Sequence, residues 1–132
     1  MAPAGGVQGS HPLRIYSYAG CSTCRKALQW LSEREVAVEV VDITTSPPSL
    51  AELRQALLSL GDRKRLFNTS GLSYRALGGP TVKAMDDHQA LAALAADGKL
   101  IKRPFLITAS GVALTGFDPQ RWLEVLPPQP PV

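Results

Sequence analysis

The residues best suited to chemistry are Cys21 and Cys24, the two cysteines of this 132-residue chain. A thiolate is a strong nucleophile, and two thiols three positions apart lie about one helical turn from each other, within reach of a disulfide. We therefore expect a redox function centred on this pair. In this interpretation Cys21 is the attacking thiol and Cys24 resolves the intermediate.

The segments on either side indicate how the pair is held. An apolar, β-prone run precedes the cysteines at residues 13–18, and a run with helical spacing follows at residues 27–31. The order strand, Cys-x-x-Cys, helix is typical of a thioredoxin-type redox site. Cys21 is then expected just before the helix, where free N–H groups and the helix dipole stabilise an anion, so its thiol pKa should fall. Arg25 and Lys26 add positive charge to the first turns.

Two other interpretations of the cysteine pair stay open. A zinc site normally needs four ligands, and beyond this pair the chain offers only His11 and His88, which disfavours a metal site within one chain. A zinc site shared between two chains is still allowed. The pair could also be two structural thiols buried under a helix, a common place for free cysteine.

Composition narrows the functional class. The hydrophobic share of 45%, the charged share of 19% and the net charge of +3 are those of a globular domain. No apolar run is long enough for a membrane span, and no basic block favours direct nucleic-acid binding. Residues 1–12 lack the features of a secretory signal and are expected to be a flexible extension, which favours a cytoplasmic protein.

The hydrophobic pattern predicts an α/β fold. Strands are expected at residues 13–18, 36–43, 100–107 and 112–117, and helices at residues 22–34, 50–60, 72–77, 88–96 and 119–126, with a further helical turn at 82–85. Ser49 and Glu52 predict a capping box, and Gly61 a helix end. The first two strands flank a helix, which makes a βαβ unit with parallel strands.

This order predicts one domain at residues 13–126, with a thioredoxin-like core, a mixed sheet and a helical insertion at about residues 49–97. The segment 127–132 is rich in proline and is expected to be a loose, extended tail.

Three ordered stretches carry a resemblance to a known family. They are Tyr18-x-x-Cys-Ser-Thr-Cys-Arg-Lys-Ala27, then residues 66–77 (Leu-Phe-Asn-Thr-Ser-Gly-Leu-Ser-Tyr-Arg-Ala-Leu), then Ile101-Lys-Arg-Pro-Phe-Leu106 followed by Leu114-Thr-Gly-Phe117. Together they resemble the glutaredoxin-like arsenate reductase (ArsC) superfamily, in particular its Spx/MgsR and YffB-type branches. The resemblance runs from about residue 13 to residue 126.

The resemblance implies roles for individual residues. The nucleophile of the family falls on Cys21, and two anion-contacting arginines fall on Arg75 and Arg103. The bond before the proline of the Arg-Pro pair is cis in the family, which implies a cis bond before Pro104. Ser22 and Thr23, at the start of the helix, are candidates to supply a hydroxyl and N–H groups to an anion.

The chain also differs from arsenate reductases of this type. They carry a third arginine about where Gly116 stands, have a His-Asn pair in place of Ser17 and Tyr18, and generally lack the second cysteine. We therefore expect weak or no arsenate reduction, and an increase in any residual activity from Gly116→Arg. If arsenate turned over without that change, Lys102 would be the first candidate for the missing charge.

Two functions follow from the motif and the resemblance. The first is a thiol-dependent reductase of an oxyanion or a mixed disulfide, with no bound cofactor or metal and with the glutathione/glutaredoxin or thioredoxin system as electron donor. The second is an Spx-like redox-sensing regulator, because members of that branch bind the C-terminal domain of the RNA polymerase α subunit. A thioredoxin-fold protein without activity is the third possibility.

Overall fold

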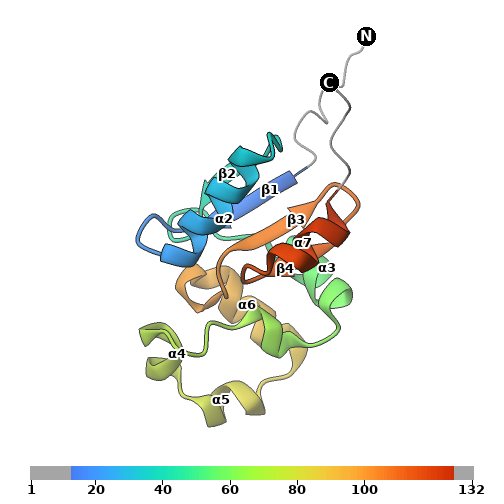
Figure 1. Cartoon of the computed structure of the whole chain (residues 1–132). Helices are drawn as coiled ribbons and strands as arrows, with labels where there is room; N and C mark the ends of the chain where they lie inside the picture. The colour runs from blue at the N-terminus through green and yellow to red at the C-terminus, as the bar shows by residue number, and fades with distance from the viewer. Residues whose placement is uncertain (1–12, 127–132) are drawn as a thin grey trace.

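The structure, a computed structural model, describes residues 13–126. The predicted flexible extension at 1–12 and the predicted tail at 127–132 lie outside these residues. Four strands form one mixed sheet in the order β2-β1-β3-β4. Their bounds are Leu13–Ser17 for β1, Glu39–Asp42 for β2, Phe105–Thr108 for β3 and Ala113–Thr115 for β4. β1 runs parallel to β2 and antiparallel to β3, and β3 and β4 are antiparallel (Figure 1).

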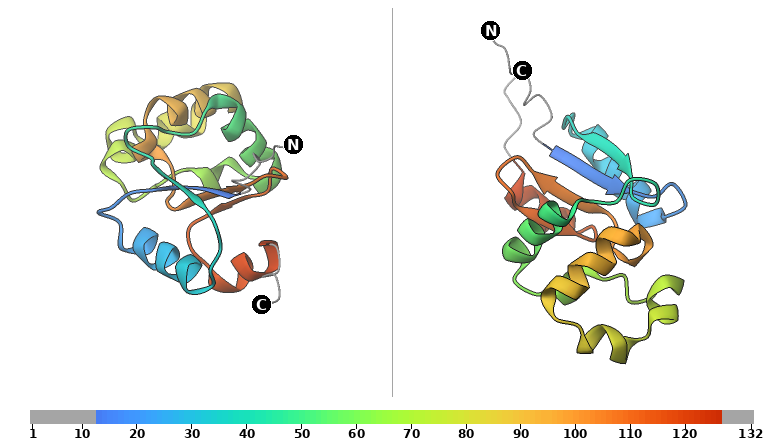
Figure 2. Two further views of the ribbon diagram at one scale, coloured as in Figure 1. Left: turned by 90° about the horizontal axis from the view of Figure 1, so that it is seen from above. Right: turned by 180° about the vertical axis from the view of Figure 1, so that it is seen from behind.

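Helices cover both faces of this sheet, as the view from above shows (Figure 2). On one face lie α2 (Ser22–Glu33) and α7 (Pro119–Val125), and on the other lie α3 (Leu50–Leu60) and α6 (Asp87–Ala96). The remaining elements are α4 (Leu72–Leu77), α5 (Gly79–Ala84) and the short 3-10 helices η1 (Arg63–Leu66) and η2 (Gly98–Leu100). The predicted thioredoxin-like α/β fold with a mixed sheet is therefore confirmed.

Alternation along the strands divides the core into two layers. On β1, Leu13 and Ile15 pack with α2 and α7, whereas Tyr16 packs with α3 and α6. On β3, Leu106 faces the first layer and Phe105 the second. Successive side chains of a strand point to opposite faces, so both helical layers are tied to the two central strands.

Local signals account for several helix ends. Ser49 and Glu52 form the predicted capping box of α3, and Gly61 ends that helix with φ of 80°. A second capping box, between Asp86 and Gln89, starts α6. Asp118 caps α7 by accepting hydrogen bonds from the N–H groups of Gln120 and Arg121.

The strands are shorter than the sequence pattern predicts. The expected strand at 100–107 begins only at Phe105, because the preceding segment pairs with the helical insertion instead of the sheet. Phe67 and Ile101 form an isolated bridge, and the Lys102 N–H donates to the Leu66 carbonyl at 2.8 Å. β2 likewise begins at Glu39, because the Val36 N–H still closes the end of α2 by donating to the Leu31 carbonyl.

Candidate active site

Cys21 lies at the junction of β1 and α2. It is the N-cap residue of α2, and its sulfur accepts a hydrogen bond from the Cys24 N–H at 3.3 Å. The preceding loop is closed by a hydrogen bond from the Cys21 N–H to the Tyr18 carbonyl at 3.0 Å. The Arg25 guanidinium also donates to the Ala19 carbonyl at 2.6 Å. The loop therefore presents the sulfur at the helix N-terminus, where an anion is stabilised.

The two thiols are free and differ in environment. Burial alone would raise the pKa of Cys21, but hydrogen bonds from the Cys24 thiol and N–H, together with the Arg103 charge, lower it below the usual cysteine value. Cys24 is fully buried, and burial followed by its hydrogen bond to Cys21 raises its pKa to about 12. Cys21 is thus the thiol that ionises first, and Cys24 stays protonated behind it.

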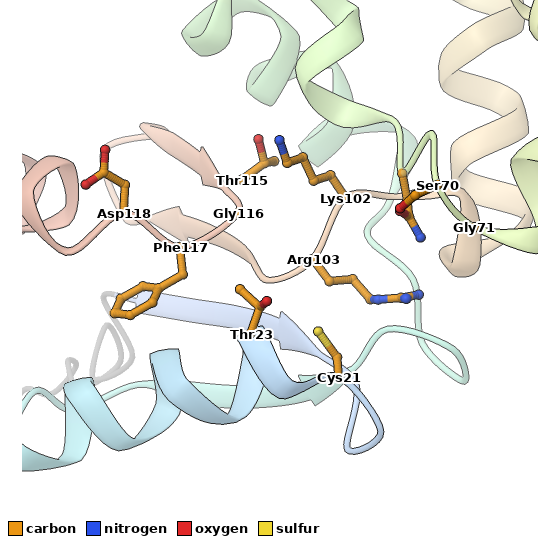
Figure 3. A pocket seen from close by; sticks show the side chains of 11 residues that line it. Cys21, Thr23, Ser70, Gly71, Lys102, Arg103, Thr115, Gly116, Phe117 and Asp118 are labelled. Carbon is orange, nitrogen blue, oxygen red and sulfur yellow. The ribbon is translucent and has the colours of Figure 1, made fainter.

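Arg103 is held beside Cys21 by its neighbours in the chain. The Lys102 N–H donates to the Leu66 carbonyl, and the Pro104 carbonyl accepts from the Gly116 N–H at 3.0 Å. The Arg103–Pro104 peptide bond is cis. The guanidinium of Arg103 lies 5.3 Å from the centre of the Tyr18 ring, a cation–π contact. In Figure 3 the Arg103 side chain passes above Cys21, with its guanidinium extending past the sulfur.

A pocket of about 620 Å³ opens over the thiol. It is built from the start of α2, the loop before α4, the segment before β3 and the loop after β4 (Figure 3). Its lining residues are Cys21, Thr23, Asn68, Ser70, Gly71, Lys102, Arg103, Thr115, Gly116, Phe117 and Asp118. The lining combines two cations and one carboxylate with hydroxyl and amide groups, a composition suited to a polar ligand.

The structure brings together some of the predicted site residues and not others. Thr23 and Arg103 line the pocket with Cys21, and Cys24 lies buried directly behind it. Ser22 is exposed on the first turn of α2 and does not line the pocket. Arg75 is exposed on α4 and is also absent from the lining, so the pocket contains one of the two predicted arginines.

Several pocket residues were not singled out by the sequence. Asn68, Ser70 and Gly71 come from the second stretch that carries the family resemblance, residues 66–77, where no role was assigned to them. In the structure, the Asn68 N–H donates to the Leu100 carbonyl at 2.7 Å, which ties this stretch to the end of η2, just before the segment that carries Arg103. Phe117 and Asp118 follow β4. Phe117 ends the last stretch that carries the family resemblance, which was the available signal for it, whereas Asp118 lies just outside that stretch.

The described residues contain neither a cluster of metal-ligating side chains nor a helix that could span a membrane. Within residues 13–126 no group of three or more His, Cys, Asp or Glu side chains is arranged to hold a metal ion. His11, one of the two histidines considered, lies outside these residues. None of the described helices is both long enough and apolar enough to cross a bilayer.

Fold and site together define a thiol redox protein of thioredoxin-like architecture. The chain belongs to the ArsC family, whose model matches residues 16–125. It is 40% identical over 115 residues to YusI of Bacillus subtilis, a relative of uncharacterised function, covering 85% of this chain and 96% of YusI. It is 32% identical over 106 residues to an arsenate reductase of Neisseria meningitidis, covering 79% and 89%.

A solved structure and two regulatory proteins are also similar to this chain. The crystal structure of a possible arsenate reductase from Streptococcus mutans superposes with a TM-score of 0.77 at 38% identity, covering 82% of this chain and 92% of that one. The regulatory protein MgsR of Bacillus subtilis is 25% identical over 114 residues, covering 86% and 89%. A global transcriptional regulator Spx from Streptococcus agalactiae matches over 45 residues, or 34% of this chain.

Proposed function

We propose that the protein is a thiol-dependent reductase in which Cys21 attacks the substrate and Cys24 resolves the intermediate. The observation that carries this proposal is the division between the two thiols. Cys21 borders an open pocket and has a lowered pKa, whereas Cys24 is buried one turn away with a raised pKa. An ionised nucleophile beside a protonated partner is the arrangement that thiol exchange needs.

The chemistry balances for a disulfide substrate. The Cys21 thiolate attacks one sulfur of the substrate, forms a mixed disulfide and releases the other sulfur as a thiolate. Cys24 then loses its proton and attacks the Cys21 sulfur, which forms the Cys21–Cys24 disulfide and releases the second thiolate. The substrate gains two electrons and the protein loses two. A thiol or dithiol donor, of the glutathione/glutaredoxin or thioredoxin system, must reduce the protein again.

An oxyanion such as arsenate would follow a related course. Cys21 would replace an oxygen on the central atom, and a second thiol would attack the Cys21 sulfur and leave the bond electrons on that atom. Arg103 and Thr23 are the proposed anion contacts at the thiol, with Ser22 and Arg75 further from the pocket. Because a dianion needs several charge-assisted partners to replace its hydration, we expect arsenate reduction to be weak.

The decisive experiment combines two cysteine variants with two electron donors. Reduction of hydroxyethyl disulfide is followed through NADPH, with glutathione and glutathione reductase in one arm and thioredoxin and thioredoxin reductase in the other. Cys21→Ser should abolish turnover, and Cys24→Ser should accumulate a mixed disulfide that intact-mass analysis detects. Wild-type protein without turnover in either arm, or an active Cys21→Ser variant, would contradict the proposal.

A redox-sensing regulator is the second candidate, favoured by the similarity to MgsR along most of the chain. In that function, formation of the Cys21–Cys24 disulfide would change binding to the RNA polymerase α subunit, in a cytoplasmic setting. The test is a binding measurement with the C-terminal domain of that subunit, using reduced protein, oxidised protein and Cys24→Ser. Binding that depends on oxidation in the wild type and not in the variant would support this function over the enzyme.

A further inference from the structure

Lys102 occupies the space that a side chain at position 116 would need. Gly116 has φ of 72°, a conformation that favours glycine, and a Cβ built there would lie 3.2 Å from Lys102 Cε and 3.8 Å from Lys102 Nζ. The end of the Lys102 side chain therefore lies beside Gly116, and both residues line the pocket (Figure 3). An arginine at 116 would be strained by this backbone conformation, and the end of the Lys102 side chain would have to shift to make room for it.

Lys102 and Arg103 are consecutive, yet their side chains serve different parts of the pocket. The Arg103 side chain lies next to Cys21, whereas Lys102 extends toward Thr115 and Gly116 (Figure 3). Hydrogen bonds fix the backbone at both ends of this pair, from Lys102 N–H to Leu66 and from Gly116 N–H to Pro104. The two cations are therefore held on different sides of the same cavity.

The Lys102 ammonium is available to a ligand. Among the residues that the structure describes, no carboxylate forms an ion pair with it. The lining holds one carboxylate, Asp118, whose oxygen Oδ1 accepts the N–H groups of Gln120 and Arg121 at the start of α7. A cation without a protein partner in a pocket favours an anionic group on the ligand.

The size of the pocket distinguishes between substrate classes. A cavity of about 620 Å³ is in the range that holds organic molecules and is far larger than a tetrahedral oxyanion requires. Arg103 is the one arginine in the lining, and the second cation is directed away from the thiol. A small oxyanion at Cys21 could not use both cations fully, but a longer ligand attached through sulfur could.

We infer that Lys102 is a specificity-determining residue and that the pocket takes an organic disulfide with a carboxylate several bonds from the attacked sulfur. This inference rests on the proposed function, because Cys21 carries out the exchange described above. Lys102 binds the carboxylate and takes no part in bond making. Its effect should therefore appear in the binding of charged substrates and not in the chemical step.

The test compares two disulfides that differ only in charge, dithiodibutyrate and its neutral diamide. Lys102→Gln should lower kcat/KM for the dicarboxylate about five- to tenfold through KM, since an ion pair at an exposed lysine is partly screened. The same substitution should leave kcat/KM for the diamide unchanged. Lys102→Arg should keep the wild-type preference for the dicarboxylate. Lys83→Gln, which removes the same charge from α5 outside this pocket, is the matched control and should change neither substrate.

The possible outcomes distinguish failure of the proposed function from failure of the inference about Lys102. Wild-type protein that reduces neither disulfide would defeat the proposed function and this inference with it. Active wild-type protein whose preference for the dicarboxylate is unchanged in Lys102→Gln would overturn the inference alone. An equal loss with both substrates would also overturn it, because such a loss indicates a role in the fold or in the chemical step.

Discussion

The Arg103 guanidinium stacks over the ring of Tyr18, with 5.3 Å between the guanidinium carbon and the ring centre. Tyr18 belongs to the loop that presents Cys21, and Arg103 belongs to the segment before β3. Two parts of the chain that are distant in sequence thus meet at the edge of the thiol pocket. The tyrosine ring limits where the guanidinium can lie relative to the sulfur.

Tyr18→Leu should weaken the attraction of the site for anions. A cation–π contact contributes about 0.5–1 kcal/mol, so its loss should lower the preference of Cys21 for an anionic reagent about two- to fivefold. The measurement is the ratio of the alkylation rates with iodoacetate and with neutral iodoacetamide. Tyr18→Phe keeps the ring and should keep the ratio. If this ratio fell equally in Tyr18→Leu and Tyr18→Phe, the hydroxyl of Tyr18, and not its ring, would position Arg103.

Removing the charge of Arg103 should raise the pKa of Cys21. The positive charge is one of the causes that hold this pKa below the usual cysteine value, so Arg103→Gln favours the protonated thiol. The midpoint of iodoacetamide labelling against pH, resolved by peptide mass analysis, should move upward, and Arg103→Lys should largely prevent the move. Arg121→Gln, on α7, is the charge control. An unmoved midpoint in Arg103→Gln would contradict the electrostatic role.

The protein should lose stability at alkaline pH through Tyr16. Burial, followed by the hydrogen bond to Glu52, raises the pKa of Tyr16 to about 12. The unfolded chain loses this proton near pH 10 and the folded protein only near pH 12, so the free energy of unfolding falls as pH rises between them. Cys24, with a pKa also raised to about 12, adds to this loss.

Urea unfolding at several pH values tests this expectation. Tyr16→Phe should be less stable than the wild type near neutral pH by about 1 kcal/mol, because its hydrogen bond to Glu52 is lost. Its stability should then fall less steeply above pH 10. Parallel curves for the two proteins over the whole range would show that Tyr16 does not carry the alkaline dependence.

Gly98 is expected to tolerate no side chain. A Cβ at this position would overlap the carbonyl oxygen of Ile43, a backbone atom that cannot move aside cheaply. Gly98→Ala should cost about 3 kcal/mol or more, because overpacking against the backbone must shift η2. Gly61→Ala is the comparison, since the space there is open and only its φ of 80° is unfavourable, which costs about 1–2 kcal/mol. Thermal unfolding of both variants shows which substitution costs more stability. A smaller loss of stability in Gly98→Ala than in Gly61→Ala would show that η2 shifts readily.

The local features of this protein follow from short stretches of its sequence. The cap at Cys21, the capping box of Ser49 and Glu52 and the helix end at Gly61 depend on neighbouring residues, so the chain order predicts them. The apolar, β-prone run at residues 13–18 likewise predicts the strand that precedes Cys21. Placing Cys21 at a helix start was enough to predict its role as the more acidic thiol.

Which distant residues share the pocket depends on how the helices and strands pack together. Arg75 and Arg103 looked equivalent in sequence, but α4 leaves Arg75 exposed, whereas the pairing of Lys102 with Leu66 holds Arg103 at the thiol. The missing side chain at Gly116 likewise looked like a lost charge, although the end of the Lys102 side chain lies beside that position. Contacts of this kind depend on how separate elements pack against one another, and no local pattern in a single sequence encodes the distance between them.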